Sequence, residues 1–150
     1  MSATAGNVHA TVVVMGDRGI MIVGRSGSGK SALAQALLDA GRACGRFASL
    51  VADDQVFLET SNNRIVARAP EAIAGLIEVR GLGPAPIAHE TSTIVDLVVS
   101  LVAETDAPRI ANEQTYEHGG VSVPLLTLPK GNTQGALRPI AAWLRLPPFC

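Results

Sequence analysis

The chain has 150 residues and a nearly balanced charge, with 12 Lys and Arg against 13 Asp and Glu. This length suits a single compact domain over residues 1–150, and 47% hydrophobic residues are enough for a core of ordinary size. A net charge of −1 excludes the basic surface typical of nucleic-acid-binding proteins, so we expect no nucleic-acid partner. The longest apolar run, residues 94–103, is too short and too polar to span a bilayer, so we expect no membrane association.

Two cysteines are present, Cys44 and Cys150, and they form no cluster with the spacing of a metal site. No disulfide framework is implied. The first ten residues carry neither a basic stretch nor an apolar block, so nothing here resembles a signal peptide. We therefore expect a reducing, cytoplasmic location.

Strand patterns and glycine turns dominate the first half of the chain. Alternating β-branched residues predict strands, and Gly41 predicts the end of the first helix. In chain order we expect a loose end at 1–7, a strand hairpin from 8–15 and 20–23, a glycine-rich loop at 24–31, a helix at 31–40, a strand at 50–52, and a hairpin from 56–59 and 64–68.

The second half continues the same pattern. Residues 94–102 fit either a strand or a buried helix, and their β-branched residues favour the strand. We also expect a helical turn at 70–75, a strand at 76–80 leading into a glycine loop, a hairpin from 115–118 and 121–128, and a terminal helix at 137–145, entered or kinked at Pro139. The prediction is an α/β fold with many hairpins and few helices, unlike the strand–helix alternation of most P-loop proteins.

The glycine-rich motif at residues 24–31 indicates nucleotide binding. An apolar strand pattern precedes it and a helix pattern follows it, as the phosphate-binding P-loop requires. Backbone N–H groups of such a loop bind phosphate oxygens, while Lys30 would reach the β- and γ-phosphates of ATP and Ser31 would bind Mg²⁺. The alternative is a chance glycine turn. The motif consists of Gly24, Arg25, Ser26, Gly27, Ser28, Gly29, Lys30 and Ser31.

Four further side chains are candidates for the chemistry. Asp53 and Asp54 end a short strand, where one carboxylate could help to hold Mg²⁺ and the other could accept a proton from a hydroxyl. Because neighbouring strand residues face opposite ways, only one of them need face the site; a turn-forming pair is the alternative. Glu78 is either a metal ligand or a solvated partner of Arg80. His9, a lone histidine, is either functional or structural.

These pieces occur together in one family. The loop at 24–31, LVADD at 50–54, IVARAP at 65–70 and IEVRGLG at 77–83 resemble, in order and spacing, the catalytic domain of the HPr kinase/phosphorylase family. The chain is similar to a short proteobacterial form that lacks an extra N-terminal domain. The resemblance extends over residues 8–83 and, less clearly, to residue 132.

The resemblance implies roles for matching residues. Asp54 corresponds to the proton acceptor for the target serine, Asp53 to its support, Glu78 to a second Mg²⁺ ligand and His9 to an active-site histidine. Arg109 corresponds, in a shortened segment, to an active-site arginine. The resemblance also implies a mixed, hairpin-rich sheet like that of phosphoenolpyruvate carboxykinase, an HPr-like phosphocarrier protein as partner, and a homo-oligomer, by family analogy a hexamer.

Two departures from the family concern the removal of phosphate from phosphoserine. Long forms carry an arginine in a loop near the end of the domain, whereas residues 128–132 here contain none. Pro84 also follows the Gly-Leu-Gly signature where branched apolar residues are usual. The sequence therefore predicts an intact kinase core, with phosphorylase activity and control by sugar phosphates in doubt.

The resulting interpretation is an ATP- and Mg²⁺-dependent protein serine kinase that acts on HPr in a phosphotransferase system. Two alternatives stay open. A small-molecule P-loop kinase would be expected to carry an arginine-rich lid, and the arginines here are scattered. A nucleotide-sensing module would bind ATP and signal through a partner without catalysis.

Overall fold

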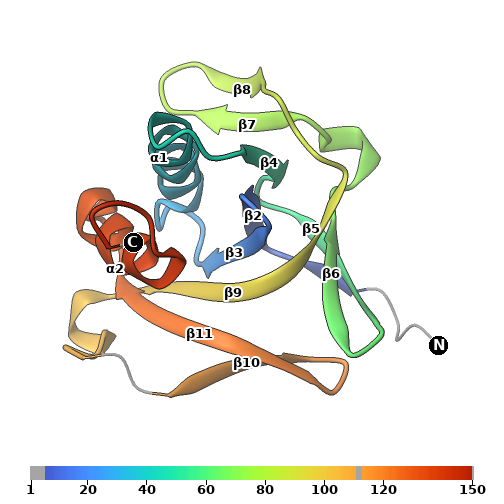
Figure 1. Cartoon of the computed structure of the whole chain (residues 1–150). Helices are drawn as coiled ribbons and strands as arrows, with labels where there is room; N and C mark the ends of the chain where they lie inside the picture. Colours follow the sequence, from blue (N-terminus) through green and yellow to red (C-terminus); the bar gives the residue numbers. More distant parts are fainter. Residues whose placement is uncertain (1–5, 111–112, 150) are drawn as a thin grey trace.

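The computed structural model describes residues 6–110 and 113–149. Its described part has nine strands in one mixed sheet, two strands in a small second sheet and two α-helices (Figure 1). The elements are β1 (Gly6–Val8), β2 (Ala10–Met15), β3 (Arg18–Gly24), α1 (Lys30–Ala43), β4 (Ala48–Ala52), β5 (Val56–Ser61), β6 (Arg64–Arg68), η1 (Glu71–Ile73), β7 (Leu76–Val79), β8 (Gly83–Pro86), β9 (Ser92–Val102), η2 (Glu104–Asp106), β10 (Gln114–His118), β11 (Val121–Pro129) and α2 (Thr133–Leu144).

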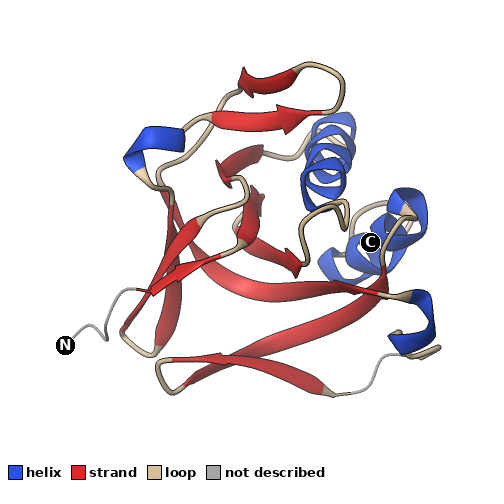
Figure 2. Cartoon of the chain, turned by 180° about the vertical axis from the view of Figure 1, so that it is seen from behind, coloured by secondary structure: helices blue, strands red, loops and turns tan. Residues whose placement is uncertain are grey.

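The long strand β9 organises the main sheet. It pairs in parallel with β3, and its other edge pairs antiparallel with β6 near Ile94 and in parallel with β11 from Val98 onward. The strand order is β1-β5-β6-β9-β3-β2-β4, with the β10–β11 hairpin attached to β9 through β11. Seen from behind, the strands curl around one another, and both helices lie on the same side of β9 (Figure 2). The fold is therefore α/β, with a mixed and curled sheet.

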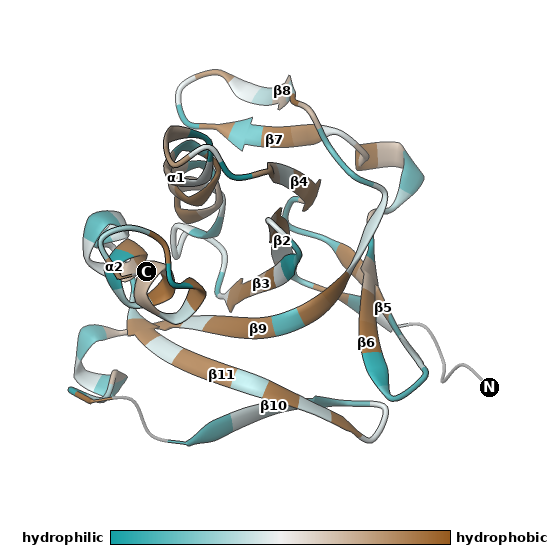
Figure 3. Cartoon of the chain, viewed as in Figure 1, coloured by the Kyte–Doolittle hydropathy of each residue, from teal (hydrophilic) through white to brown (hydrophobic). Residues whose placement is uncertain are grey.

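Two apolar cores lie on the two faces of the central strands. Leu33 and Leu37 of α1 pack with Ile20 and Ile22 of β3 on one face. On the other face, strands β2, β3 and β9 pack against the curled β5–β6 and β10–β11 hairpins, with Met21 at 0% exposure. Hydrophobic residues accordingly run along most of β9 and β6 (Figure 3). Alternation along β3 sends its side chains into both cores, which fixes the strand that leads to the glycine-rich loop.

Most predicted elements are confirmed, including the hairpins and the strand interpretation of residues 94–102. Four predictions are wrong. Gly6 and Asn7 are not loose, because they pair with β5; residues 1–5 lie outside the described residues. The terminal helix begins earlier, at Thr133, where the Asn132 side chain caps it by accepting a hydrogen bond from the Gly135 N–H. Pro139 therefore lies inside this helix.

Gly41 does not end the first helix, which continues to Ala43. A Cβ at position 41 would lie 2.8 Å from Met15 Cε and 2.9 Å from Ala48 Cβ, so the glycine lets α1 pack closely on β2 and β4. The close packing of α1 on the sheet, and not the end of the helix, therefore explains the glycine at this position. The strand β8 was also not expected; it pairs with β7 in the second sheet.

No helix within residues 6–110 and 113–149 is long and apolar enough to cross a membrane. Cys150, noted in the sequence, lies outside the described residues.

Candidate active site

The glycine-rich loop joins the end of β3 to the start of α1 and closes around the Lys30 side chain. Lys30 is 6% exposed. Its ammonium group donates hydrogen bonds to the carbonyls of Gly24 (2.9 Å) and Arg25 (3.2 Å). Gly27 and Gly29 have φ angles of 82° and 95°, which other residues adopt only at a cost. These angles turn the chain so that the loop wraps over the first turn of α1.

The loop also contains a buried hydroxyl without a partner. Ser28 is 4% exposed, and its Oγ has no hydrogen-bond partner in the described structure. A Cβ at Gly24 would lie 2.6 Å from this oxygen, so Gly24 leaves room for it. A buried orphan hydroxyl, a lysine ammonium and the N-terminus of α1 in one loop fit a phosphate group.

Asp53 connects the loop to three other elements. Its Oδ1 accepts hydrogen bonds from the hydroxyls of Ser31 (2.6 Å) and Thr11 (2.9 Å), and its Oδ2 accepts one from the backbone N–H of Glu78 (2.7 Å). Asp53 is 7% exposed. Its carboxylate therefore links α1, β2 and β7 at the end of β4. Four elements meet at this one side chain, which holds the geometry of the site.

Asp54 has a different environment, although it is the next residue. Its φ of 68° places it in the left-handed region, and its N–H donates to the Thr11 Oγ1 at 3.2 Å. The residue is exposed, and its carboxylate has no hydrogen bond or ion pair to any described residue. Because the backbone turns here, Asp53 and Asp54 line the same cavity, which strand alternation would have prevented.

That cavity has a volume of about 390 Å³ and extends from the glycine-rich loop to β7. Gln35 of α1 closes one side, where its Nε2 donates to the Glu78 carbonyl at 3.0 Å. A second hollow of about 180 Å³ shares Asp53, Asp54 and Glu78 and continues toward η1 and β8. These three acids therefore line both the larger cavity and the smaller hollow. The larger cavity is lined by Ser26, Gly27, Gly29, Lys30, Ser31, Ala32, Gln35, Asp53, Asp54, Glu78 and Arg80.

The oxygen groups beside the loop suit a hard divalent cation. The Ser31 hydroxyl and the Asp53 carboxylate are in direct contact, and Glu78 lines the same cavity. Within the described residues, no three His, Cys, Asp or Glu side chains are grouped so as to bind a metal by themselves. Mg²⁺ typically takes one or two carboxylates and completes its shell with phosphate oxygens and water, so the donor set fits Mg²⁺ bound together with a phosphorylated ligand.

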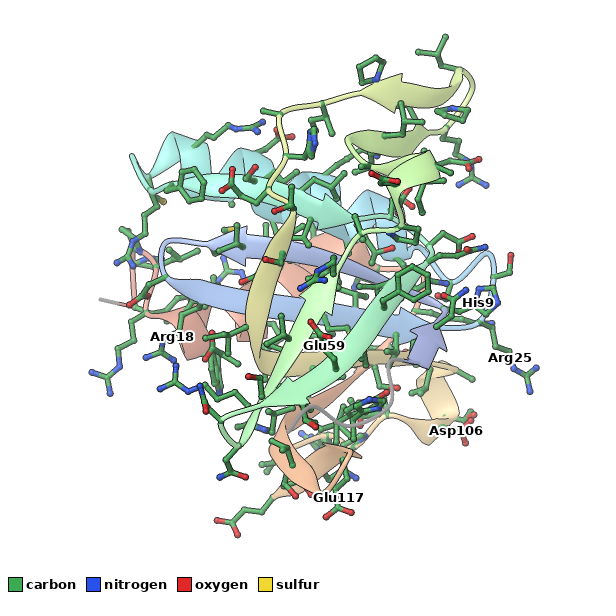
Figure 4. The ribbon with its side chains drawn as sticks, turned by 90° about the vertical axis from the view of Figure 1, so that its right-hand side faces the viewer. His9, Arg18, Arg25, Glu59, Asp106 and Glu117 are labelled. Atoms are coloured by element: carbon green, nitrogen blue, oxygen red, sulfur yellow. The ribbon has the colours of Figure 1, made fainter. Side chains whose placement is uncertain are left out.

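Two of the candidate residues predicted from the sequence do not line this cavity. His9 is exposed at the break between β1 and β2, and Figure 4 shows it on the same side of the molecule as Arg25. Arg109 is exposed in the loop after η2, next to residues outside the description. Neither lines the cavity. Glu78 and Arg80 both line it, but among the described residues no ion pair joins them.

Sequence reasoning missed two residues of the site, Thr11 and Gln35. Thr11 is 0% exposed and binds both aspartates of the pair. Its hydroxyl donates to the Asp53 carboxylate and accepts from the Asp54 backbone N–H. A threonine at the start of a run of valines was the only signal. Gln35 lies one turn after Ser31 on α1, and that spacing places both on the same face of the helix.

Comparisons with known proteins find related sequences and a similar fold. The family model described as the HPr serine kinase C-terminal domain matches residues 2–136. Among curated proteins, the HPr kinase/phosphorylase of Caldicellulosiruptor bescii is 32% identical over 133 residues, covering 81% of this chain and 41% of that protein. The protein of the same name from Mycoplasmopsis pulmonis is 42% identical over 76 residues, covering 51% of this chain and 23% of that protein.

A solved structure is similar over most of the chain. The Hpr(Ser) kinase/phosphatase from Coxiella burnetii superposes with a TM-score of 0.77 at 26% identity, covering 93% of this chain and 88% of that one. This chain spans about two fifths of the length of the first curated relatives, 41% in each of two of them. Because the family model covers most of its residues, the chain belongs to the HPr serine kinase C-terminal domain family.

Proposed function

We propose that this chain is an ATP- and Mg²⁺-dependent kinase that phosphorylates a serine of an HPr-like phosphocarrier protein, in the cytoplasm and in the service of a phosphotransferase system. The observation that carries the proposal is the contrast within the aspartate pair. Asp53 is buried and accepts three hydrogen bonds, whereas the Asp54 carboxylate is exposed and unpaired in the same cavity. A free carboxylate beside a phosphate-binding loop is what a general base needs.

The chain's own residues divide the work. ATP supplies the phosphoryl group, and Mg²⁺ supplies charge neutralisation. The loop N–H groups and the Lys30 ammonium hold the phosphates, and Ser31, Asp53 and Glu78 hold the cation. Asp54 takes the proton of the serine hydroxyl as the serine oxygen bonds to the γ-phosphorus and ADP leaves. Positioning supplies most of the acceleration, so rigid support of this acid matters.

The finer fold and assembly are part of the proposal. We infer a P-loop domain of the phosphoenolpyruvate carboxykinase type over residues 1–150, which assembles as a homo-oligomer, by family analogy a hexamer. We also assign a role near the phosphates to His9 and to Arg109, neither of which lines the cavity; Arg109 would have to reach the site from its loop or from a neighbouring copy. Both assignments rest on the family resemblance.

Removal of phosphate from phosphoserine has less support. Residues Pro129, Gly131 and Asn132 line a small groove together with Ser28 and Gly29 of the loop, so this segment lies beside the phosphate site. It carries Lys130 and no arginine. We therefore propose that the kinase reaction predominates.

Incubation with ATP, Mg²⁺ and an HPr-like protein tests the function, with phosphoserine on the latter read by mass spectrometry. We expect phosphate on one serine, and we expect Asp54→Asn to abolish transfer while ATP binding by calorimetry stays near the wild-type value. Asp39→Asn, an exposed acid on α1, is the matched control and should keep full activity. Tight ATP binding without transfer by the wild-type chain would contradict the kinase and favour a nucleotide-sensing module.

A further inference from the structure

A second polar cavity lies at the end of β3 opposite the glycine-rich loop. It has a volume of about 130 Å³ and is formed by the β2–β3 turn, the α1–β4 connection and the end of α2. Arg18 begins β3, whereas Arg25 follows its last residue, and Figure 4 shows these two residues at opposite ends of the molecule. Seven strand residues separate the two sites by about 20 Å, at roughly 3.3 Å per residue.

Positive charge predominates in this cavity. Three arginines line it, Arg18, Arg46 and Arg145, against a single acid, Asp17. The Arg18–Asp17 pair is long, at 3.8 Å, and Asp17 is 98% exposed, so it neutralises little charge. No described acidic group pairs with Arg46 or Arg145. About two positive charges are therefore left without a counterion in one small hollow.

The rest of the cavity is built from buried apolar groups. Met15 (3% exposed) and Leu146 (2% exposed) form part of its wall, and the half-buried Trp143 ring stacks under the Arg18 guanidinium at 5.4 Å. Arg145 adopts a φ of 57°, a conformation that costs a non-glycine residue energy. The three arginines are exposed residues that surround this hollow, and the Trp143 ring packs against the Arg18 guanidinium.

We propose that this cavity binds the phosphate group of a small dianion, either inorganic phosphate or a phosphate monoester. Guanidinium groups bind phosphate oxygens in pairs through their planar N–H fork, and three around one hollow match a dianion in charge and in number of donors. This site is separate from the proposed active site and does not depend on the kinase assignment.

Another role of these arginines has to be separated from ligand binding. Arg46 and Arg145 lie near the C-terminal ends of α1 and α2, where positive charge offsets the helix dipole. The Arg46 guanidinium also lies 3.5 Å from the Arg145 carbonyl, at the limit of a hydrogen bond. Dipole compensation predicts an effect of these residues on stability but no saturable anion binding.

Trp143 is the only tryptophan in the chain and it lines this cavity, so its fluorescence is a probe of binding here. We would titrate inorganic phosphate and, separately, glycerol 3-phosphate at constant ionic strength, using Lys30→Ala as the background so that the glycine-rich loop contributes little. Calorimetry on the same samples detects binding that leaves the fluorescence unchanged. We expect saturable binding with one site. Equal affinities would identify free phosphate as the ligand, and tighter binding of the ester would identify a monoester.

Arg46→Gln should weaken the binding by about tenfold or more, because a charged hydrogen-bond donor is lost. Arg145→Asn, which tolerates the left-handed backbone, should do the same, and both variants should show wild-type circular dichroism. Arg64→Gln, an exposed arginine on β6, is the matched control and should bind normally. Absence of saturable binding in both measurements, or binding that Arg46→Gln and Arg145→Asn leave unchanged, would overturn the proposal.

Discussion

The Ser31 hydroxyl donates a 2.6 Å hydrogen bond to Oδ1 of Asp53 and so joins the first turn of α1 to the end of β4. The same carboxylate also accepts from Thr11 and from the Glu78 backbone. A short bond to a charged acceptor is among the stronger hydrogen bonds in proteins. This relationship makes the acid a support for the site as well as a candidate cation ligand, and the two roles are separable by experiment.

Asp53→Asn should lower the free energy of unfolding of the ligand-free protein by about 1–3 kcal/mol. The amide can still accept from one or two hydroxyls, but its NH₂ group would then face the Glu78 N–H, which is also a donor. Urea denaturation followed by circular dichroism measures the change. Asp39→Asn is the control, and an Asp53→Asn protein as stable as that control would show that the carboxylate is not needed as a support.

Asp54→Gly should be more stable than Asp54→Ala by about 1 kcal/mol, because glycine adopts the observed φ of 68° without strain. Both variants lack the carboxylate, so both should lose phosphoryl transfer. Thermal unfolding and the transfer assay together check the prediction. Equal stability of the two variants would mean that the backbone relaxes out of the left-handed region.

Gly41→Ala should destabilise the protein even though alanine is the better helix former. The propensity gain is about 1 kcal/mol. The added methyl group would lie 2.8 Å from Met15 Cε and 2.9 Å from Ala48 Cβ, and such overpacking typically costs 1–3 kcal/mol. We expect a net loss of about 1 kcal/mol in denaturant unfolding. Asp39→Ala, on the exposed face of α1, should instead be neutral or stabilising; a stabilising Gly41→Ala would show that α1 can shift away from the sheet.

Tyr116 provides a test of burial by pH. Burial raises the pKa of its phenol above the ordinary value of 10.0, and it is the only tyrosine in the chain. The folded state thus binds this proton more tightly than the unfolded state, so its stabilising effect is complete below pH 10 and is lost as the pH rises through the folded pKa. Ultraviolet absorbance should show a higher midpoint in buffer than in urea, and coincident midpoints would contradict the burial.

Much of the site could be predicted because it depends on local sequence order. A strand, a glycine-rich loop and a helix bring Lys30 and Ser31 to one place, and a second strand ending in two acids lies beside them. Which acid is buried could not be predicted, because that depends on the positive φ of Asp54 and on the Thr11 hydroxyl from another strand. Neither feature leaves a pattern in the sequence.

Two of the wrong predictions, those for Gly41 and for β8, share one physical origin. Gly41 was interpreted from local rules as a helix stop, yet its role is a close approach between α1 and the sheet. The strand β8 contains two prolines and was interpreted as a loop, but pairing with β7 at a sheet edge accommodates them. Tertiary contacts decide both cases, and local propensity does not include them.

The pairing of β3 with β9 also has a consequence for folding. Gly19 pairs with Val95 and Gly24 with Leu101, so the strand that carries the glycine-rich loop pairs with the adjacent β2 on one edge but gains the neighbour on its other edge only from the far half of the chain. Parallel pairings between such distant segments have a high contact order and form late. During synthesis the loop would therefore leave the ribosome before β9 exists, and the apolar edge of β3 that later pairs with β9 would be exposed until then, as partly folded segments that bind chaperones are.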